Sequence, residues 1–166
     1  MRQASAEVEI GAPAEKVWEV LADFGSVSVF NPSVTESHLT TDHASGLGAI
    51  RHCDLTVPGA SIEERIVDWE DGRSLTVEIH GGTRNPFAKA LATMAVEPLD
   101  TDRSVAKMSI EWRAKGGPIA GLLDRALQGQ NRKTITGVLA GLKHYVETGD
   151  PVAGRQTIDR SAVRVG

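Results

Sequence analysis

Two strand-like runs, residues 49–55 and 61–69, hold the side chains best suited to acid–base chemistry in this sequence. A Pro-Gly turn joins them, as expected for two neighbouring antiparallel strands. Side chains alternate between the two faces of a strand, so Glu64 shares a face with Ile62 and Ile66. The face with two isoleucines is the better candidate for the protein interior. We therefore expect Glu64 to point inward.

The first of these runs, "AIRHCDL", does not reveal its inner face by composition. One face carries Arg51, Cys53 and Leu55, and the other carries Ile50, His52 and Asp54. The partner of an inward carboxylate decides its chemistry. Alone, a buried carboxyl group can act as an acid or base near neutral pH. Paired with an arginine, it stays ionised and either anchors a polar ligand group or water, or simply braces the sheet.

Composition limits the class of protein. The 166 residues suit one domain with its own core, and a net charge of -4 argues against a nucleic-acid binder. Cys53 is the only cysteine, which excludes an internal disulfide and a cysteine-cluster metal site. The five histidines show no metal-binding helix spacing, and we expect no metal and no cofactor. Without a signal peptide or a long apolar run, we expect a cytoplasmic protein with no stable membrane insertion.

Local patterns predict a strand, two short helices, six strands and one long helix. The first strand covers residues 5–10, a helix follows in 11–25, and a second brief helix or turn ends at Pro32. Strand-like runs come at 34–40, 49–55, 61–69, 74–80, 90–99 and 105–114, separated by turn chemistry. Residues 118–148 keep the rhythm of an amphipathic helix, weakened by Gly129, Gly137 and Gly141. Residues 150–166 show no convincing period, and we expect a disordered tail.

This order of elements predicts an α+β fold, in which a curved seven-stranded antiparallel sheet surrounds a long C-terminal helix and leaves an apolar pocket. The order, together with "APAEKVWEVLADFGSVSVFNP", "GLGAIRHCDL", "IEERIVDWED", "LTVEIHGG" and "LAGLKHYVETG", resembles the START/Bet v 1-like superfamily (SRPBCC) over roughly residues 4–149. Within it, the chain resembles the bacterial polyketide cyclase/dehydrase and lipid-transport family. The resemblance implies a helix-grip fold with a ligand-binding domain over residues 1–149. It also puts Arg51, Cys53 and Leu55 inside, with Glu64.

Two loops are similar to those of the plant abscisic-acid receptors. "TVPGA" falls where their proline-containing gate loop lies, and "GGTRNP" falls where their latch loop lies. The gate's serine-glycine-leucine-proline order is not kept, and Arg84 stands where those receptors carry histidine. The resemblance therefore implies two loops at a pocket mouth and not hormone recognition. His80, just before Gly81-Gly82, is a further candidate for ligand contact.

Three side chains are candidates for catalysis: Glu64, Arg51 and His80. A wall rich in methionine and aliphatic groups suits a flexible apolar ligand. The alternative is that these residues fill the interior and leave no room for a ligand. The expected ligand-binding residues are Phe30, Cys53, Leu55, Ile62, Ile66, Val77, Ile79, Arg84, Asn85, Met94, Met108, Ile110, Trp112, Leu127, Gln130, Asn131, Thr134 and Val138.

Two functions of different classes fit this pattern. In the first, the pocket folds a polyketide-like substrate, and Glu64 moves a proton next to a carbonyl during cofactor-free cyclisation or dehydration. Arg51, Arg84 or Asn85 would then steady the enolate oxygen. In the second, the protein is a non-catalytic carrier or sensor of a lipid or metabolite. Under either hypothesis we expect the protein to bind a small hydrophobic molecule and to be a monomer or a homodimer. A pocket-bearing interaction module is a third hypothesis.

Overall fold

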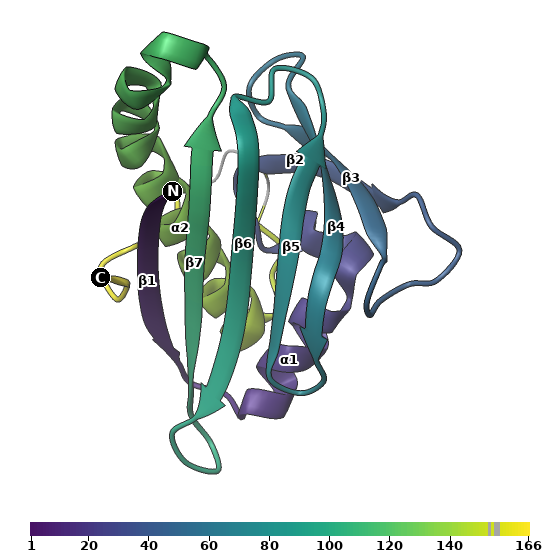
Figure 1. The fold of residues 1–166 in the computed structure, drawn as a ribbon. Coiled ribbons are helices and arrows are strands. Elements are labelled where there is room, and N and C mark those ends of the chain that lie inside the picture. Colours follow the sequence, from purple (N-terminus) through teal and green to yellow (C-terminus); the bar gives the residue numbers. More distant parts are fainter. Residues whose placement is uncertain (153, 155–156) are drawn as a thin grey trace.

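A curved antiparallel sheet and a long helix packed on one of its faces dominate the computed structural model of this chain (Figure 1). The structure describes residues 1–152, 154 and 157–166. The strands are β1 (Arg2–Ile10), β2 (Val34–Leu39), β3 (Ile50–Leu55), β4 (Ser61–Glu70), β5 (Ser74–Gly81), β6 (Phe87–Pro98), β7 (Ser104–Ala114) and β8 (Arg164–Val165). The helices are α1 (Ala14–Ala22), η1 (Phe24–Val29), η2 (Gly117–Ile119) and α2 (Ala120–Thr148), of which η1 and η2 are 3-10 helices.

The strands lie in the order β2-β3-β4-β5-β6-β7-β1-β8. Strands β2 to β7 thus form a meander, joined by the short turn-rich connections that the sequence predicts. Alternation sorts their side chains, so that Ile110 and Trp112 of β7 are buried while Glu111 and Arg113 are exposed. Helices α1 and α2 lie on the buried face (Figure 1). The fold is the expected α+β helix-grip arrangement.

Helix α2 covers the sheet along only part of its length. From Ala120 to Gln130 no residue is buried, whereas Asn131, Ile135 and most residues up to Leu142 are. Its first turns extend past the end of β7 in Figure 1. The interior is therefore closed beneath the second half of α2 and is less covered beneath the first half.

The glycines of α2 have different surroundings. A Cβ atom at Gly141 would overlap the carbonyl oxygen of Phe30, so the segment between η1 and β2 approaches the helix at this point. A Cβ atom at Gly129 would meet nothing within 4 Å. The glycine at position 141 thus permits close packing of two elements, while the one at 129 has no such role.

The sheet has eight strands instead of the predicted seven, because β8 pairs with Ala6 and Glu7 of the edge strand β1. A two-residue strand has no period for sequence analysis to detect.

The predicted disorder of residues 150–166 falls partly on residues 153, 155 and 156, which lie outside the described residues. Among the others, Val152 is buried and donates its backbone N–H to Val29 O (2.7 Å). Strand β6 also begins at Phe87, earlier than predicted, because its pairing with β7 continues to Ala114.

Candidate functional site

A buried ion pair joins the two strands that the sequence singled out. Arg51 of β3 and Glu64 of β4 are direct cross-strand partners. Their side chains are inward and nearly inaccessible, with residue exposures of 8 % and 7 %. Arg51 Nε and Nη2 lie 2.7 and 2.6 Å from the same oxygen, Glu64 Oε2. The first run therefore presents Arg51 and Cys53 to the interior, which composition alone left undecided.

Arg51 is held on a second side by Phe24 of η1. Its Nη1 donates a hydrogen bond to the Phe24 carbonyl oxygen (2.8 Å), and its guanidinium carbon lies 4.0 Å from the centre of the Phe24 ring. These contacts satisfy the cation by charge, hydrogen bonds and ring stacking at once. No sequence signal pointed to Phe24, since it lies 27 residues before Arg51.

Glu64 keeps one oxygen free. The hydrogen bonds that its side chain receives from described residues both end on Oε2: one from Arg51 Nε (2.7 Å) and a long one, 3.8 Å, from Cys53 Sγ, while Arg51 Nη2 makes its ion-pair contact with the same oxygen. None of them reaches Oε1. A carboxylate oxygen without a hydrogen bond from the protein can accept one from a bound molecule.

Cys53 is a fully buried thiol beside the ion pair. Burial raises the pKa of its thiol from 9.0 to about 12, and the negative charge of Glu64 acts in the same direction, while Arg51 opposes both. The thiolate is the reactive form of cysteine, so the thiol is inert at neutral pH.

Two further polar groups lie inside without a partner. Trp112 Nε1 and Asn131 Nδ2 are buried N–H donors that bond to no acceptor in the described structure. Trp112 lies on the inner face of β7, and Asn131 is the first buried residue of α2. Gln128, one turn before Asn131, donates to Gln3 O of β1 (3.1 Å). Gln3 pairs with Glu111, the neighbour of Trp112 on β7, so this turn of α2 lies at the height of Trp112. Facing elements thus bring both donors to one region.

Partly buried apolar side chains lie near the loops that precede β4 and β6. Four apolar side chains that pack against the core are only partly buried at this end: Leu55, Ile62, Phe87 and Leu127. The two loops, residues 56–60 and 81–86, are tied together, because Arg84 Nη1 donates to Pro58 O (3.0 Å) and Thr83 N donates to Ser61 Oγ (3.0 Å). Arg84 has a φ of 59°, a left-handed conformation that is uncommon for residues other than glycine.

The comparisons with known proteins agree with this geometry. Residues 1–147 match the family described as polyketide cyclase / dehydrase and lipid transport. The chain belongs to this family. A search of curated protein sequences found no match.

Solved structures show the same fold at low identity. The protein XoxI from Bacillus cereus is 21% identical, with a TM-score of 0.74 over 89% of this chain and 97% of that one. A START superfamily protein from Mycobacterium smegmatis is 17% identical, with a TM-score of 0.71 over 87% and 97%. The di-domain ARO/CYC BexL from the BE-7585A biosynthetic pathway is 21% identical, with a TM-score of 0.68 over 89% of this chain and 47% of that one. The chain therefore shares the START/Bet v 1-like fold.

Some of the predicted site residues lie in the closed core of this family member. Phe30, Ile66, Val77, Ile79, Met94, Ile110 and Val138 are all buried in the main apolar cluster. Leu55, Ile62, Met108 and Leu127 border that cluster and are partly exposed.

Other predicted residues lie away from the ion pair or are already engaged. His80 is on the outer face of β5, where its Nε2 lies 3.7 Å from Glu63 Oε2. Gln130 is exposed, and Thr134 donates to the Gln130 carbonyl oxygen (3.1 Å) of its own helix. Asn85 holds the 81–86 loop, since its side chain accepts from Phe87 N (2.9 Å) and donates to Gly81 O (3.2 Å).

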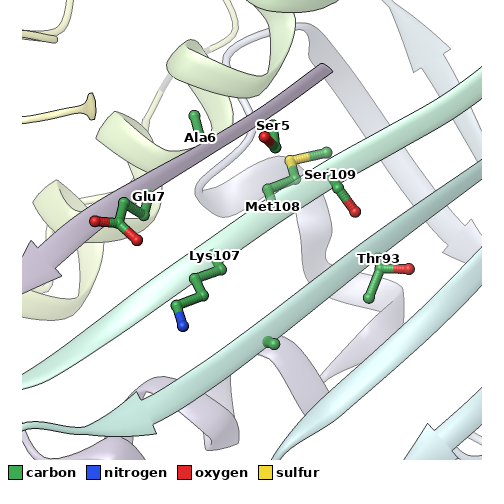
Figure 2. Close-up of a pocket in the computed structure, with 8 residues that line it drawn as sticks. Ser5, Ala6, Glu7, Thr93, Lys107, Met108 and Ser109 are labelled. Atoms are coloured by element: carbon green, nitrogen blue, oxygen red, sulfur yellow. The ribbon is translucent and has the colours of Figure 1, made fainter. Parts of the chain in front are cut away.

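A hollow of about 400 Å³ lies on the outer side of the sheet, across β1, β6 and β7 (Figure 2). Its lining includes Ser5, Glu7, Thr93, Lys107 and Ser109. Lys107 is the obvious charged anchor there, but its Nζ is paired with Glu97 Oε2 at 2.7 Å. The hollow shares no residue with the Arg51–Glu64 site.

Two classes of feature are not found in the described part of the chain. No three histidine, cysteine or acidic side chains gather there in a way that could hold a metal ion. Within the same residues, no helix combines the length and the apolar content needed to cross a membrane.

Proposed function

We propose that this protein binds a small hydrophobic molecule between the inner face of its sheet and α2. The two unpartnered donors, Trp112 Nε1 and Asn131 Nδ2, carry the proposal. A buried donor without an acceptor costs about 1–3 kcal/mol, and folded proteins keep few of them. A carbonyl or hydroxyl oxygen on an otherwise apolar molecule would accept from these groups, and Glu64 Oε1 would accept from a hydroxyl.

The molecule would enter past the partly exposed Ile62 and Leu127, between the first half of α2 and the loops at 56–60 and 81–86. The bond from Arg84 to Pro58 would have to open or shift for a large ligand, which makes the loop pair a gate. The ligand-binding domain of residues 1–149 would contain every part of this site. The family description, lipid transport as well as cyclase, agrees with an apolar ligand.

Titration with the neutral fluorescent dye N-phenyl-1-naphthylamine tests this proposal. We expect saturable binding at one dye per chain, with native mass spectrometry to give the stoichiometry. Ile62→Trp, which narrows the entry, should weaken binding at least ten-fold. Thr93→Trp, which fills the outer hollow, is the matched control and should leave the affinity unchanged. If Thr93→Trp abolished binding and Ile62→Trp did not, the interior site would be wrong.

Proton-transfer catalysis is the second candidate, and the free Oε1 of Glu64 favours it. We propose that Glu64 acts as a base that removes a proton from a carbon next to a carbonyl. The electron pair of the broken C–H bond would move to form an enolate, whose oxygen Trp112 or Asn131 would stabilise. Arg51 would act as a positioning residue, since it donates to both Glu64 Oε2 and the Phe24 carbonyl oxygen and so fixes the carboxylate in place. In the carrier alternative, the same carboxylate only anchors the ligand.

Hydrogen–deuterium exchange into an aromatic ketone separates these two candidates without knowledge of the natural substrate. In heavy water, a catalytic Glu64 would exchange the protons next to the carbonyl of 1-tetralone faster than buffer does. The Glu64→Gln variant should lose this acceleration while it still binds the dye. Equal exchange by the wild-type protein and the variant would exclude Glu64 as the base and leave the carrier function.

A further inference from the structure

Four large apolar side chains are exposed at one end of the molecule. Ile119, Leu122 and Leu123 follow one another at helical spacing around the start of α2, and Val57 lies in the 56–60 loop. Their exposures are 60 %, 74 %, 39 % and 54 %. We call these four residues the apolar tip. Monomeric proteins rarely gather exposed apolar groups in this way unless the surface contacts something.

The three segments that surround the tip are tied to one another. Arg84 of the 81–86 loop donates to Pro58 O (3.0 Å), next to Val57. The backbone N–H of Lys115, just before η2, donates to Pro86 O (2.9 Å), and Lys115 Nζ donates to Asn85 O (3.2 Å). Figure 1 shows these connections at the same end of the sheet, with the first turns of α2 standing beyond it. The four residues of the apolar tip therefore lie on segments that share one end of the sheet.

Cations without a carboxylate partner lie beside the tip. Lys89, Arg113, Lys115 and Arg125 are all exposed, and in the described part of the chain none of them forms an ion pair. Lys89 and Arg113 are even direct cross-strand neighbours, an arrangement of like charges that disfavours folding. Elsewhere Arg73, Arg103, Lys107 and Lys143 each pair with a carboxylate, whereas Arg2, Lys16 and Arg65 form no ion pair with the described residues. In a protein with a net charge of -4, this end is locally basic.

We propose that the apolar tip docks on an anionic lipid surface. Apolar side chains on a helix enter the boundary between head groups and acyl chains, while nearby lysine and arginine contact the anionic head groups. The partner is a membrane surface because the tip combines both features, apolar groups at its point and unpaired cations around it. The proposal rests on the surface alone and would stand if the interior bound no ligand.

Sedimentation with vesicles tests the docking. At low salt, we expect the protein to bind vesicles of phosphatidylcholine with 30 % phosphatidylglycerol and to bind pure phosphatidylcholine at least ten-fold more weakly. Half-molar salt should release it, because screening weakens the head-group contacts. Failure to bind the anionic vesicles, or equal binding to both kinds, would overturn the proposal.

Matched variants assign the binding to this end. Leu122→Ser with Leu123→Ser should weaken vesicle binding at least five-fold, whereas Leu99→Ser, a leucine with 50 % exposure in the β6–β7 turn, should not. Exchange of Arg113, Lys115 and Arg125 for glutamine should have a similar effect, with Arg73→Gln as the control. Circular dichroism would check that each variant is folded. The proposal would also be overturned if the wild-type protein formed a dimer and did not bind vesicles, and if the leucine variants abolished that dimer. The apolar tip would then contact a second copy of the chain.

Discussion

Arg51 and Glu64 face each other across β3 and β4, and two nitrogens of the guanidinium converge on a single carboxylate oxygen at 2.6 and 2.7 Å. The pair lies inside an otherwise apolar interior, where an ion needs a partner to be tolerated. Arg51 also donates to the Phe24 carbonyl oxygen, while no described residue donates a hydrogen bond to Glu64 Oε1. This arrangement leaves Oε1 as the carboxylate oxygen of Glu64 without a hydrogen bond from the described residues.

Removal of one partner should destabilise the protein strongly. Arg51→Met would leave the Glu64 carboxylate buried without its counter-ion, and we expect the free energy of unfolding to fall by about 3–5 kcal/mol. The double variant Arg51→Met with Glu64→Leu should recover much of this loss, because no charge then remains inside. Urea unfolding of the wild-type protein and of these two variants measures both effects. A single variant that loses less than about 1 kcal/mol would contradict a tightly coupled buried pair.

The buried thiol makes stability depend on pH in the alkaline range. The pKa of Cys53 is about 12 in the folded protein, against 9.0 for an ordinary thiol, so the folded state holds a proton that the unfolded state loses first. The contribution of this group is fully present below pH 9 and declines as the pH rises toward 12. We expect the free energy of unfolding to fall more steeply above pH 9 in the wild-type protein than in Cys53→Ala. Parallel curves for the two proteins would contradict the shift.

The same burial should protect Cys53 from alkylation. Iodoacetamide at pH 8 should modify the thiol in urea-unfolded protein and leave the folded protein unmodified over the same time. Mass spectrometry of the intact chain follows the reaction. Rapid modification of the folded protein would mean that the interior opens at this position.

Two glycines of one helix should respond oppositely to alanine. Gly141→Ala places a methyl group against the Phe30 carbonyl oxygen, and we expect a loss of about 1–3 kcal/mol from the forced shift of backbone. Gly129→Ala meets nothing and should gain up to about 1 kcal/mol in helix propensity. Thermal unfolding of both variants tests this prediction. It fails if the two substitutions have the same sign.

Arg84 should control how fast a ligand enters and leaves. Without its bond to Pro58, the loops at 56–60 and 81–86 lose one of their ties, so Arg84→Gly should speed dissociation of N-phenyl-1-naphthylamine several-fold in stopped-flow experiments. Glycine also fits the left-handed backbone at this position, so the variant should remain stable. Arg73→Gly lies in a distant turn and is the control. An unchanged dissociation rate would show that the loop pair is not a gate.

The parts of the site that local patterns predict are those that depend on strand alternation. Because Glu64 shares a strand face with Ile62 and Ile66, alternation predicts that it points inward. The helical spacing of residues 118–148 likewise predicts α2. Arg51 was different, because Ile50 and Leu55 lie on opposite faces of its strand and balance each other. What settles its direction in the structure is Phe24, a partner far away in the chain. Such distant contacts leave no local period.

The same reasoning accounts for the other differences. His80 follows the buried Ile79 on β5, so alternation turns it outward, and its place beside the Gly81-Gly82 loop does not change that. Gln130 and Thr134 flank Asn131, the first buried residue of α2, but Gln130 is exposed and the Thr134 hydroxyl bonds within its own helix. β8 exists only as a partner of the β1 edge.

The most direct test of an interior ligand site is a nitrogen–proton correlation spectrum of the tryptophan indole groups. The chain has three tryptophans. Trp18 Nε1 already donates to Asp71 Oδ1 (3.1 Å), whereas Trp112 Nε1 has no partner among the described residues, so Trp18 and Trp69 are internal controls. Titration with a panel of neutral aromatic ketones, from two to four fused rings, should move the Trp112 signal downfield in a saturable way and leave the other two in place. If no ketone in the panel moved Trp112, or if all three signals moved together, the proposed interior site would be contradicted.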